Sequence, residues 1–344
     1  MNVSIVGATG YGGLELIRFL TNHPHLQIES LHTSSQFGRS IHEENPHLMH
    51  MKDKLEAIDP EKIAKKSDIV FLATPSGVSS QLISQFSDLD LKVIDLSGDL
   101  RLQTPGEYER WYKKEAAPQS ILEKAIYGLA EWNAEEIRQS TIIANPGCYP
   151  TATLLGLAPL FTEGWATGSD VIIDAKSGVS GAGKSPSVVT HYSEMNENFK
   201  IYKVNQHQHI PEIEQQLGRW SKDLQPISFN THLVPMTRGI MATMYVKLNR
   251  QTSTAELRDL YETIYDKHPF VRIQPLDHFP STKQVYGSNF CDIGVAYDER
   301  TGRATIVSVI DNLVKGAAGQ AIQNANLLMG IEETTGLWNT PLYP

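Results

Sequence analysis

A strand, a glycine-rich turn and a helix follow one another at the start of the chain, and this order constrains the fold more than any other feature. Residues 3–6 are mostly apolar and predict a buried strand, and residues 14–20 repeat apolar side chains with the period of a helix. Between them, glycines spaced as GxxGxxG permit a tight turn, close approach of the backbone to a pyrophosphate and close helix–strand packing. The sequence therefore predicts a Rossmann-type dinucleotide-binding unit whose turn comprises Gly7, Ala8, Thr9, Gly10, Tyr11, Gly12 and Gly13.

The residues after the second predicted strand, 27–31, indicate which dinucleotide is bound. In NAD-binding proteins an acidic side chain at this point holds the ribose 2′-hydroxyl. Residues 32–40 contain no carboxylate, but they contain hydroxyl groups and an arginine, which suit a 2′-phosphate. We therefore predict NADP(H) as the cofactor, held here by Ser34, Ser35 and Arg39. The alternative is that Arg39 is a solvated loop charge.

Strands and helices alternate through the first half of the chain, which is typical of an α/β fold with a doubly wound parallel sheet. Three further buried strands are predicted at 68–73, 92–97 and 141–144. Ligands bind beyond the carboxyl ends of such strands. We therefore expect the cofactor to contact Thr74, Pro75 and Ser76, and we expect Arg101 and Cys148 to line the same crevice.

After about residue 165 the predicted strands become longer and more exposed, which favours an α+β domain with a mostly antiparallel sheet. The strands are predicted at 169–177, 228–234, 240–248, 271–273, 291–297 and 303–310. Helices are predicted at 256–267 and 316–330. The expected domains are 1–147 for NADP binding, 148–312 for catalysis and dimerisation, and 313–344 for a C-terminal helix that packs back on the first domain.

Cys148 is the strongest candidate for chemistry because it stands in a turn between a strand and a helix. It lies in the run NPGCYPT, with the strand 141–144 before it and apolar residues of helical period after it. Backbone N–H groups and the dipole at a helix N-terminus favour an anion, so a thiol there is shifted toward the nucleophilic thiolate. The alternative is a small buried hydrophobic residue, which is what most reduced cysteines are.

Charge and cysteine content exclude several classes of protein. Lys and Arg total 30 against 39 for Asp and Glu, a net charge of −9, and no basic run occurs. This argues against nucleic acid or an anionic membrane as a partner. No signal peptide and no membrane-spanning apolar stretch are evident. With two cysteines in 344 residues, a disulfide framework is not expected, the predicted location is the reducing cytoplasm, and Cys291 is expected to be structural.

A histidine-rich segment raises the question of a metal site. His42, His47 and His50 lie near Glu43 and Glu44. Their spacing matches no usual zinc pattern, so we expect a polar surface loop there and no metal.

Residues 178–185 match the P-loop pattern GxxxxGK[ST] and follow a predicted strand. In a P-loop, backbone amides and Lys184 would cradle nucleotide phosphates, and the chain would be a phosphotransferase. Against this, Pro186 and the residues after it predict no long amphipathic helix, and the first domain already has a nucleotide-binding pattern. The alternatives are a mobile glycine loop, or a loop that closes over a substrate with Lys184 near an anion.

His207 and His209 alternate with other residues, so in extended structure both side chains would point the same way. Either could move a proton beside Cys148, oriented by Glu212. Glu212 also suits the first turn of a helix. A metal pair would lack a third ligand, and surface or core roles are the remaining alternatives.

Together these motifs resemble the N-acetyl-γ-glutamyl-phosphate reductases, which are related to aspartate-semialdehyde dehydrogenase. The resemblance covers nearly the whole chain and rests on GATGYGG, VIDLSGDLRL, YGLAEWN, NPGCYPT, SGVSGAGKSP, HQHIPEIEQ, HLVPMTRGI, YGSNFCDIGV and DNLVKGAAGQAIQNAN. One departure is Ser76 in ATPSGVS, where ALPHGVS is expected. Contacts to the cofactor are therefore expected to differ in that loop.

The resemblance implies a role for each candidate residue. Cys148 is the nucleophile, and His209 rather than His207 is the acid/base, with Glu212 as its partner. SGVSGAGKSP resembles the substrate-side loop of the family, which argues against the P-loop. The resemblance also places Gly181 and Asn312 at the cofactor, and Arg101, Lys184 and Asn145 at the substrate.

The implied reaction is the NADPH-dependent reduction of N-acetyl-glutamyl 5-phosphate to N-acetyl-glutamate 5-semialdehyde and phosphate, through a thioester on Cys148, in arginine biosynthesis. The family suggests a homodimer or homotetramer. Three alternatives stay open. They are a reductase for carrier-protein-linked glutamyl or aminoadipyl phosphate, a P-loop phosphotransferase and a non-enzymatic NADP-binding regulator.

Overall fold

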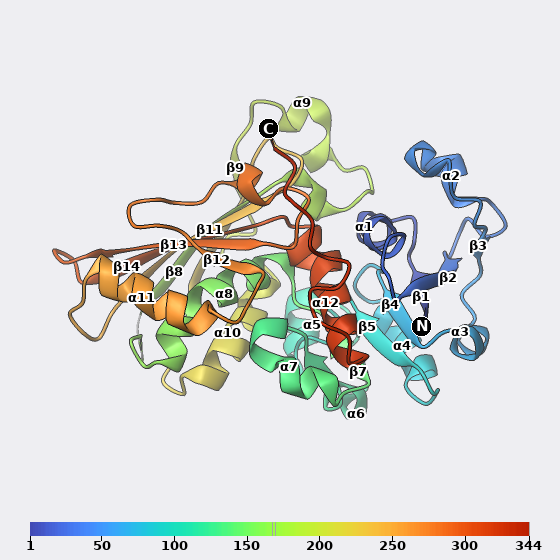
Figure 1. Cartoon of the computed structure of the whole chain (residues 1–344), viewed down its shortest axis with the longest axis horizontal. Helices are drawn as coiled ribbons and strands as arrows, with labels where there is room; N and C mark the ends of the chain where they lie inside the picture. Colours follow the sequence, from blue (N-terminus) through green and yellow to red (C-terminus); the bar gives the residue numbers. More distant parts are fainter. Residues whose placement is uncertain (167, 169, 344) are drawn as a thin grey trace. The chain divides into compact units, whose positions relative to one another are not determined.

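The computed structural model describes residues 1–166, 168 and 170–343, and the chain divides into two compact units (Figure 1). The first unit comprises Met1–Gly147 together with Ala317–Trp338. The second comprises Cys148–Gly316 and the segment that starts at Asn339. The chain therefore passes into the second unit at Cys148.

A seven-stranded parallel sheet forms the centre of the first unit, with the strand order β3-β2-β1-β4-β5-β7-β6. The strands are β1 (Asn2–Val6), β2 (Gln27–His32), β3 (Leu55–Glu56), β4 (Ile69–Leu72), β5 (Lys92–Asp95), β6 (Ile126–Tyr127) and β7 (Ile142–Ala144). From β1 the chain builds outward to β3 on one side and then, starting at β4, toward the other side. This order confirms the predicted doubly wound sheet.

Helices and short turns connect these strands. They are α1 (Tyr11–Leu20), α2 (Ile41–Glu44), α3 (Pro60–Lys66), α4 (Ser79–Phe86), α5 (Glu107–Tyr112), α6 (Gln119–Leu122), α7 (Ala130–Arg138) and, from the C-terminal part of the chain, α12 (Gly319–Leu328). Every residue of β4 is buried. A strand that is apolar throughout is expected where both faces of a parallel sheet are covered.

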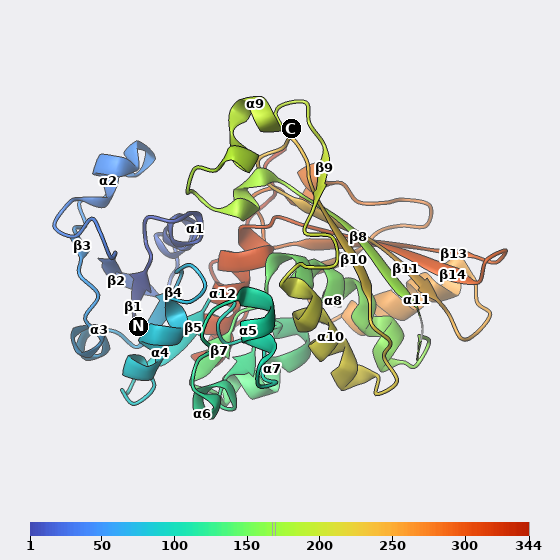
Figure 2. The ribbon, with the colours of Figure 1, turned by 180° about the vertical axis from the view of Figure 1, so that it is seen from behind.

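The second unit contains a mixed, mostly antiparallel sheet with the order β12-β13-β14-β11-β8-β10-β9 (Figures 1 and 2). The strands are β8 (Val171–Ser177), β9 (Lys200–Tyr202), β10 (Ser228–Leu233), β11 (Ile240–Lys247), β12 (Val271–Ile273), β13 (Cys291–Asp298) and β14 (Arg303–Ile310). The β10–β8 and β12–β13 pairs are parallel and the others are antiparallel. The predicted α+β architecture is confirmed.

Three helices pack on one side of this sheet. α8 (Cys148–Thr162) contacts β11 and β14, α11 (Thr254–Tyr265) contacts β13, and α10 (His209–Trp220) lies against α8. Along β8, buried residues alternate with half-buried ones. This alternation is expected where one face of a strand is covered more completely than the other.

α8 is almost entirely buried, and Pro159 inside it removes one helical hydrogen bond. In an uninterrupted helix, the carbonyl of Leu155 would accept that bond. Instead, the hydroxyl of Tyr265 donates to this carbonyl (2.5 Å), and the hydroxyl of Tyr261 donates to the carbonyl of Gly156 (2.6 Å). Side chains of α11 thus satisfy the backbone around the proline and fix α8 in place.

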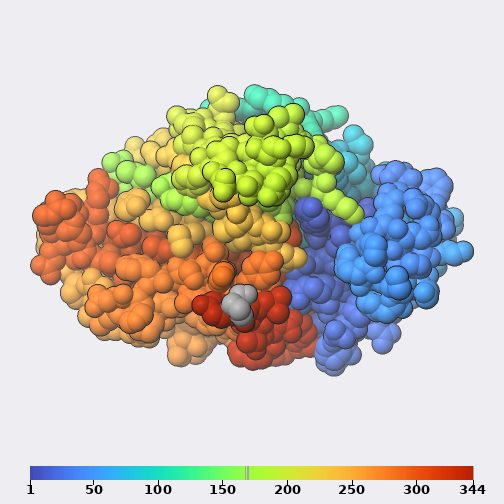
Figure 3. Space-filling view, turned by 90° about the horizontal axis from the view of Figure 1, so that it is seen from above, coloured from blue at the N-terminus to red at the C-terminus, as the bar shows by residue number. Residues whose placement is uncertain are grey.

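Residues between β8 and α10 form an exposed surface of the second unit, drawn in yellow-green in Figure 3. The segment contains short 3₁₀ turns and α9 (Tyr192–Met195). Large apolar side chains are exposed here, with Val188, Tyr192 and Phe199 at 79, 77 and 57 %. This segment therefore exposes several large apolar side chains to solvent.

Several element boundaries differ from the prediction, and two of the differences affect the second half of the chain. The strand predicted at 169–177 begins at Val171, and Ser169 lies outside the described residues. The closing helix begins only at Gly319, because a π-helical turn, Val314–Ala318, precedes it. In the part of the chain that the structure describes, no helix is both long and apolar enough to cross a membrane.

His23 links the start of the first unit to its C-terminal segment. The imidazole Nδ1 accepts the N–H groups of Leu26 (2.9 Å) and His25 (3.2 Å), so the ring proton is on Nε2. Nε2 faces the side-chain oxygen of Asn326 (3.1 Å) and the carbonyl of Thr335 (3.0 Å). Burial lowers the pKa of His23 below its ordinary value, in keeping with a neutral ring.

We expect His23→Asn to lower the free energy of unfolding by about 1–2 kcal/mol at pH 7.5, because bonds of a buried side chain are lost. The difference between the two proteins should shrink below pH 6.5. The pKa of His23 is 6.5 in the unfolded chain and lower in the folded chain. Below pH 6.5 the ring therefore takes up a proton more readily in the unfolded chain, which reduces the stability of the wild type. Urea unfolding at pH 7.5 and 5.5 measures the difference. An equal difference at both pH values would contradict the neutral ring.

Candidate functional site

The predicted cofactor turn forms where β1 meets α1, and two of its glycines leave no space for a side chain. Gly7 has φ +88°, and a Cβ there would lie 2.4 Å from the carbonyl oxygen of Ala73. A Cβ on Gly13 would lie 2.4 Å from the carbonyl oxygen of Gly7. Gly10 caps α1 with no side-chain hydrogen bond. The turn therefore has the close helix–strand packing that a dinucleotide site needs.

The groups predicted to hold a 2′-phosphate lie after β2. Ser34 and Ser35 are exposed. The guanidinium of Arg39 pairs with Glu43 (3.2 Å) and Glu44 (2.7 Å), and its side chain is half exposed. Exposed ion pairs of this kind contribute about 0–1 kcal/mol. Breaking these ion pairs, so that Arg39 binds a phosphate in place of Glu43 and Glu44, would therefore cost little free energy.

The loop after β4 is adjacent to the glycine turn, because β4 pairs directly with β1. In this loop the hydroxyl of Thr74 bonds that of Ser79 (2.8 Å), and Lys114 donates to the carbonyl of Ser76. The structure thus brings the predicted loop, Thr74–Ser76, beside the predicted turn.

Arg101 and Asn145 lie together in the first unit, at the ends of β5 and β7. Arg101 donates to the carbonyls of Asn145 (2.8 Å) and Leu96 (2.9 Å). The Asn145 amide donates to the carbonyl of Ala317 (3.1 Å) and accepts from Asn324 (3.0 Å). Both side chains are buried and brace the turn before Cys148.

Cys148 is the first residue of α8 and is partly buried. Gly316 packs against it, since a Cβ on Gly316 would lie 2.8 Å from the Cβ of Cys148. The backbone N–H of Gly316 donates to the carbonyl of Asp311 (3.0 Å), and Lys315 is fully buried with its ammonium 5.7 Å from the ring centre of Phe270. The nucleophile candidate is therefore backed by a tightly held turn that the sequence analysis did not identify.

The predicted histidine pair belongs to the same unit, but its local structure differs from the prediction. His209 begins α10, so the pair is not extended and the alternation argument was wrong. The rings nevertheless lie close, with centroids 4.7 Å apart. His207 precedes the helix, and its Nδ1 accepts the backbone N–H of His209 (3.1 Å). Glu212 is fully buried three residues after His209, on the same side of the helix.

His207 is held neutral. Its ring is 3 % exposed and meets Tyr149, Tyr202 and Phe229 edge to face, with centroids 5.4, 5.7 and 5.5 Å away. Burial, together with the charge of Lys203, lowers the pKa of His207 to about 3. A ring that stays neutral cannot supply a proton from an imidazolium near neutral pH.

Two tyrosines contact the histidines: Tyr149, which directly follows Cys148, meets both rings, and Tyr202 meets the ring of His207. The hydroxyls of Tyr149 and Tyr202 are 3.1 Å apart, and the Tyr149 hydroxyl also donates to the carbonyl of His232 (3.4 Å). Burial raises the pKa of Tyr202 to about 12 and raises that of Tyr149 as well. Both hydroxyls therefore keep their protons, and these tyrosines are site residues that the sequence analysis missed.

The glycine loop does not have P-loop geometry. Residues Val179–Ala182 form a 3₁₀ turn, and residues 186–191 after it contain only another 3₁₀ turn in place of a helix. Asn312 holds the loop, since its amide donates to the hydroxyl of Ser180 (3.0 Å) and accepts from the N–H of Gly239 (2.8 Å). Gly181 lies inside this turn, and Lys184 is exposed beyond it. The phosphotransferase alternative lacks its structural basis.

The histidine-rich segment and Cys291 were the remaining candidates from the sequence. Among the described residues no group of three or more His, Cys, Asp or Glu side chains could hold a metal ion. Nδ1 of His42 faces the carbonyl of Met51 (2.9 Å). Cys291 is buried, with its sulfur 3.3 Å from the hydroxyl of Ser308.

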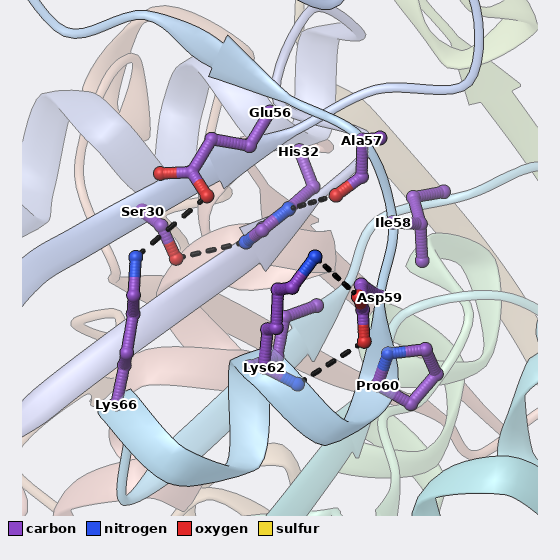
Figure 4. A pocket seen from close by; sticks show the side chains of 10 residues that line it. Ser30, His32, Glu56, Ala57, Ile58, Asp59, Pro60, Lys62 and Lys66 are labelled. Carbon is purple, nitrogen blue, oxygen red and sulfur yellow. Dashed lines mark hydrogen bonds and ion pairs between the residues drawn. The ribbon is translucent and has the colours of Figure 1, made fainter.

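A cavity of about 370 Å³ lies between β2, β3 and α3 (Figure 4). Its charged groups pair within its own wall, Lys66 with Glu56 (3.8 Å) and Lys62 with Asp59 (2.9 Å). At its floor, His32 bonds the carbonyl of Ala57 and the hydroxyl of Ser30. None of the residues predicted for the site lines this cavity.

Comparison with known proteins defines the class first. Residues 2–140 match the family model described as "Semialdehyde dehydrogenase, NAD binding domain", and residues 148–312 match "Semialdehyde dehydrogenase, dimerisation domain". The structure resembles aspartate semialdehyde dehydrogenase II of Vibrio cholerae complexed with ASA, with TM-score 0.73 and 18 % identity over 96 % of this chain and 98 % of that one. It also resembles the Candida albicans enzyme with NADP, with TM-score 0.72 and 15 % identity over 95 % and 98 %. These likenesses show the fold.

The sequence relatives are more specific. The chain is 58 % identical to an N-acetyl-gamma-glutamyl-phosphate reductase of Geobacillus sp. (strain WCH70) and 55 % identical to one of Bacillus cereus (strain AH187), over 100 % of both chains in each case. The chain belongs to the N-acetyl-gamma-glutamyl-phosphate reductase family, and the resemblance found in the sequence is confirmed.

We expect Gly316→Ala to lower reductase turnover by about 10²-fold, because the new methyl group displaces Cys148 by a fraction of an ångström to an ångström. The rate at which iodoacetamide alkylates Cys148 should change with it. Gly218→Ala on α10, where a Cβ meets nothing within 4 Å, is the matched control and should leave both rates unchanged. Wild-type turnover in Gly316→Ala would show that the contact does not set the position of the thiol.

Proposed function

We propose that this chain catalyses the NADPH-dependent reduction of N-acetyl-glutamyl 5-phosphate to N-acetyl-glutamate 5-semialdehyde, with release of phosphate, as a step of cytoplasmic arginine biosynthesis. The observation that carries the proposal is the position of Cys148 at the start of a buried helix, followed directly by a tyrosine that contacts His207 and His209. Full-length identity with reductases of that name supports it. Residues 1–147 would bind the cofactor and 148–312 would carry catalysis and dimerisation, while of the predicted C-terminal part 313–344 the stretch Ala317–Trp338 belongs to the first unit.

The cofactor proposed is NADP(H). The glycine turn suits a pyrophosphate, since side chains at Gly7 and Gly13 would collide with the backbone of Ala73 and Gly7, respectively. Ser34, Ser35 and Arg39 would bind the 2′-phosphate. The Thr74–Ser76 loop, which lies beside the glycine turn, would also contact the cofactor. When bound, NADPH supplies the hydride for the reduction.

Cys148 would form the covalent bond. Its sulfur attacks the carbonyl carbon of the acyl phosphate. The bond between that carbon and the phosphate oxygen breaks, phosphate is released, and the acyl group remains on Cys148 as a thioester. The α8 N-terminus favours the negative charge that the sulfur carries before attack and that the substrate oxygen carries after hydride addition. Arg101, Lys184 and Asn145 are the proposed substrate-side groups, with Arg101 suited to an anionic oxygen.

His209 would move the proton. It protonates the oxygen of the reduced adduct and takes the proton back as the carbon–sulfur bond breaks, which leaves aldehyde and thiolate. Buried Glu212 orients it within α10. His207 has a positioning role, because its Nδ1 accepts the N–H that begins the helix.

The first test is the reverse reaction, phosphate-dependent oxidation of N-acetyl-glutamate 5-semialdehyde. We expect a higher kcat/KM with NADP⁺ than with NAD⁺. Cys148→Ser should lower turnover by at least about 10³-fold while NADPH binding persists, because the hydroxyl is a far weaker nucleophile. Cys291→Ser is the control and should stay active. Normal turnover in Cys148→Ser would end the proposal.

The second test separates the two histidines. His209→Asn should lower kcat by about 10²–10⁴-fold, the usual contribution of a general acid. His207→Asn keeps a hydrogen-bond acceptor and should lower kcat by about tenfold or less. The two kcat values, measured at saturating substrate, decide between them. Equal losses in both variants would contradict the assignment of His209 as the proton donor.

The protein is proposed to be a homodimer or homotetramer joined through the second unit. Residues 148–312 match a dimerisation domain. The sheet face opposite the helices carries Ile172, Met241 and Tyr245, which are half-buried or exposed in the single chain. Apolar side chains on an open sheet face favour association with a second copy.

A further inference from the structure

Asp99 follows β5 in the run VIDLSGDLR and is fully buried. A carboxylate inside a protein costs several kcal/mol unless hydrogen-bond donors surround it. The donors around Asp99 therefore indicate which part of the structure this charge serves.

Two of these donors are backbone N–H groups at the start of α4. The N–H of Gly77 lies 2.9 and 2.7 Å from the two carboxylate oxygens, and the N–H of Ser80 lies 2.8 Å from one of them. The N-cap residue of α4 is Val78, which has no polar side chain to cap the helix. Asp99 therefore caps α4 from a distant part of the chain.

The rest of the carboxylate faces α5. The hydroxyl of Tyr108 donates to Asp99 (2.6 Å), and Tyr108 stacks on Tyr112 at 4.6 Å. Tyr112 in turn covers Gly98, where a Cβ would lie 2.3 Å from the Tyr112 hydroxyl oxygen. This packing leaves Asp99 little freedom to move.

A second buried carboxylate, Asp95, reaches the same turn through Ser79. Asp95 accepts the N–H (3.0 Å) and hydroxyl (2.8 Å) of Ser97, and it also bonds the hydroxyl of Ser79. Ser79 is bonded to Thr74 (2.8 Å). The turn 74–80 is thus held by Asp95 through Ser79 and by Asp99 through Gly77 and Ser80.

This turn lies against the proposed pyrophosphate site. Ala73 is the residue whose carbonyl oxygen a Cβ on Gly7 would approach to 2.4 Å. A shift of residues 74–80 therefore moves one wall of the glycine turn.

We propose that Asp99 is a positioning residue for the cofactor, which holds the Thr74–Ser80 turn in the conformation that meets NADPH. The inference rests on the proposed function, because it assumes that this turn contacts the cofactor. Asp99 is itself fully buried. It acts through the backbone of Gly77 and Ser80.

The test is Asp99→Asn, which keeps the size of the side chain but removes its negative charge and replaces one acceptor oxygen with an N–H₂ group. We expect the Kd for NADPH, measured by fluorescence titration, to rise about tenfold, and kcat at saturating NADPH to stay within about twofold. Asp292→Asn, at a carboxylate of similar burial in the second unit, is the matched control. It should cost stability and leave the Kd unchanged.

Ser79→Ala is the second variant, in case Asp99→Asn fails to fold. It removes the hydroxyl between Thr74 and Asp95 and should raise the Kd about threefold. An unchanged Kd in a folded Asp99→Asn protein, or in Ser79→Ala where Asp99→Asn does not fold, overturns the proposal. Wild-type protein that does not bind NADPH defeats the proposed function instead, so the two failures are distinguishable.

Discussion

Buried polar groups must have hydrogen-bond partners, and this constraint fixes the functional turns of both units. Arg101 satisfies carbonyls at the ends of β5 and β7, and Asp99 satisfies the N–H groups that begin α4. In the second unit, Asn312 ties the glycine loop to β11, and Tyr265 satisfies the backbone that Pro159 leaves open. In each case a side chain of one element completes the backbone at the end or at a break of another. Turns held in this way can place reacting groups with little loss of entropy on binding.

Local patterns account for what the sequence could predict. The glycine turn, the strand and helix that flank Cys148, and most long strands depend on periodicity and turn residues within about ten positions. Elements of two to four residues, such as β3, β6 and α9, are too short to show a period. The alternation of His207 and His209 would align their side chains only in extended structure, whereas Glu212 suited the first turn of a helix, and the structure has the helix from His209. The His209 N–H, at the start of that helix, donates to the His207 ring.

The site residues that the sequence analysis missed are those whose role depends on a distant segment. Gly316 matters because it packs on Cys148, and Tyr202 matters because its hydroxyl meets that of Tyr149. No local pattern marks either residue, since a glycine in an alanine-rich stretch or a tyrosine in a short strand is ordinary by itself. The sequence identified Arg101 and Asn145 as candidates. In the structure, however, both side chains donate hydrogen bonds to backbone carbonyl groups. Part of the effect of these two residues on catalysis would therefore arise through the shape of the turn.

The N-termini of α1, α4 and α8 lie at functional turns and differ in what occupies them. α1 has Gly10 as its cap, and glycine has no side chain to occupy the positive end of the helix, which suits an anionic ligand. α4 has the buried carboxylate of Asp99 at its start, which satisfies its N–H groups and offsets its positive end. α8 begins with the cysteine itself. An anionic cofactor in the first unit would therefore bind at the N-terminus of α1 rather than at that of α4. In the second unit, the N-terminus of α8 would stabilise negative charge on the Cys148 sulfur and on the reacting carbonyl oxygen.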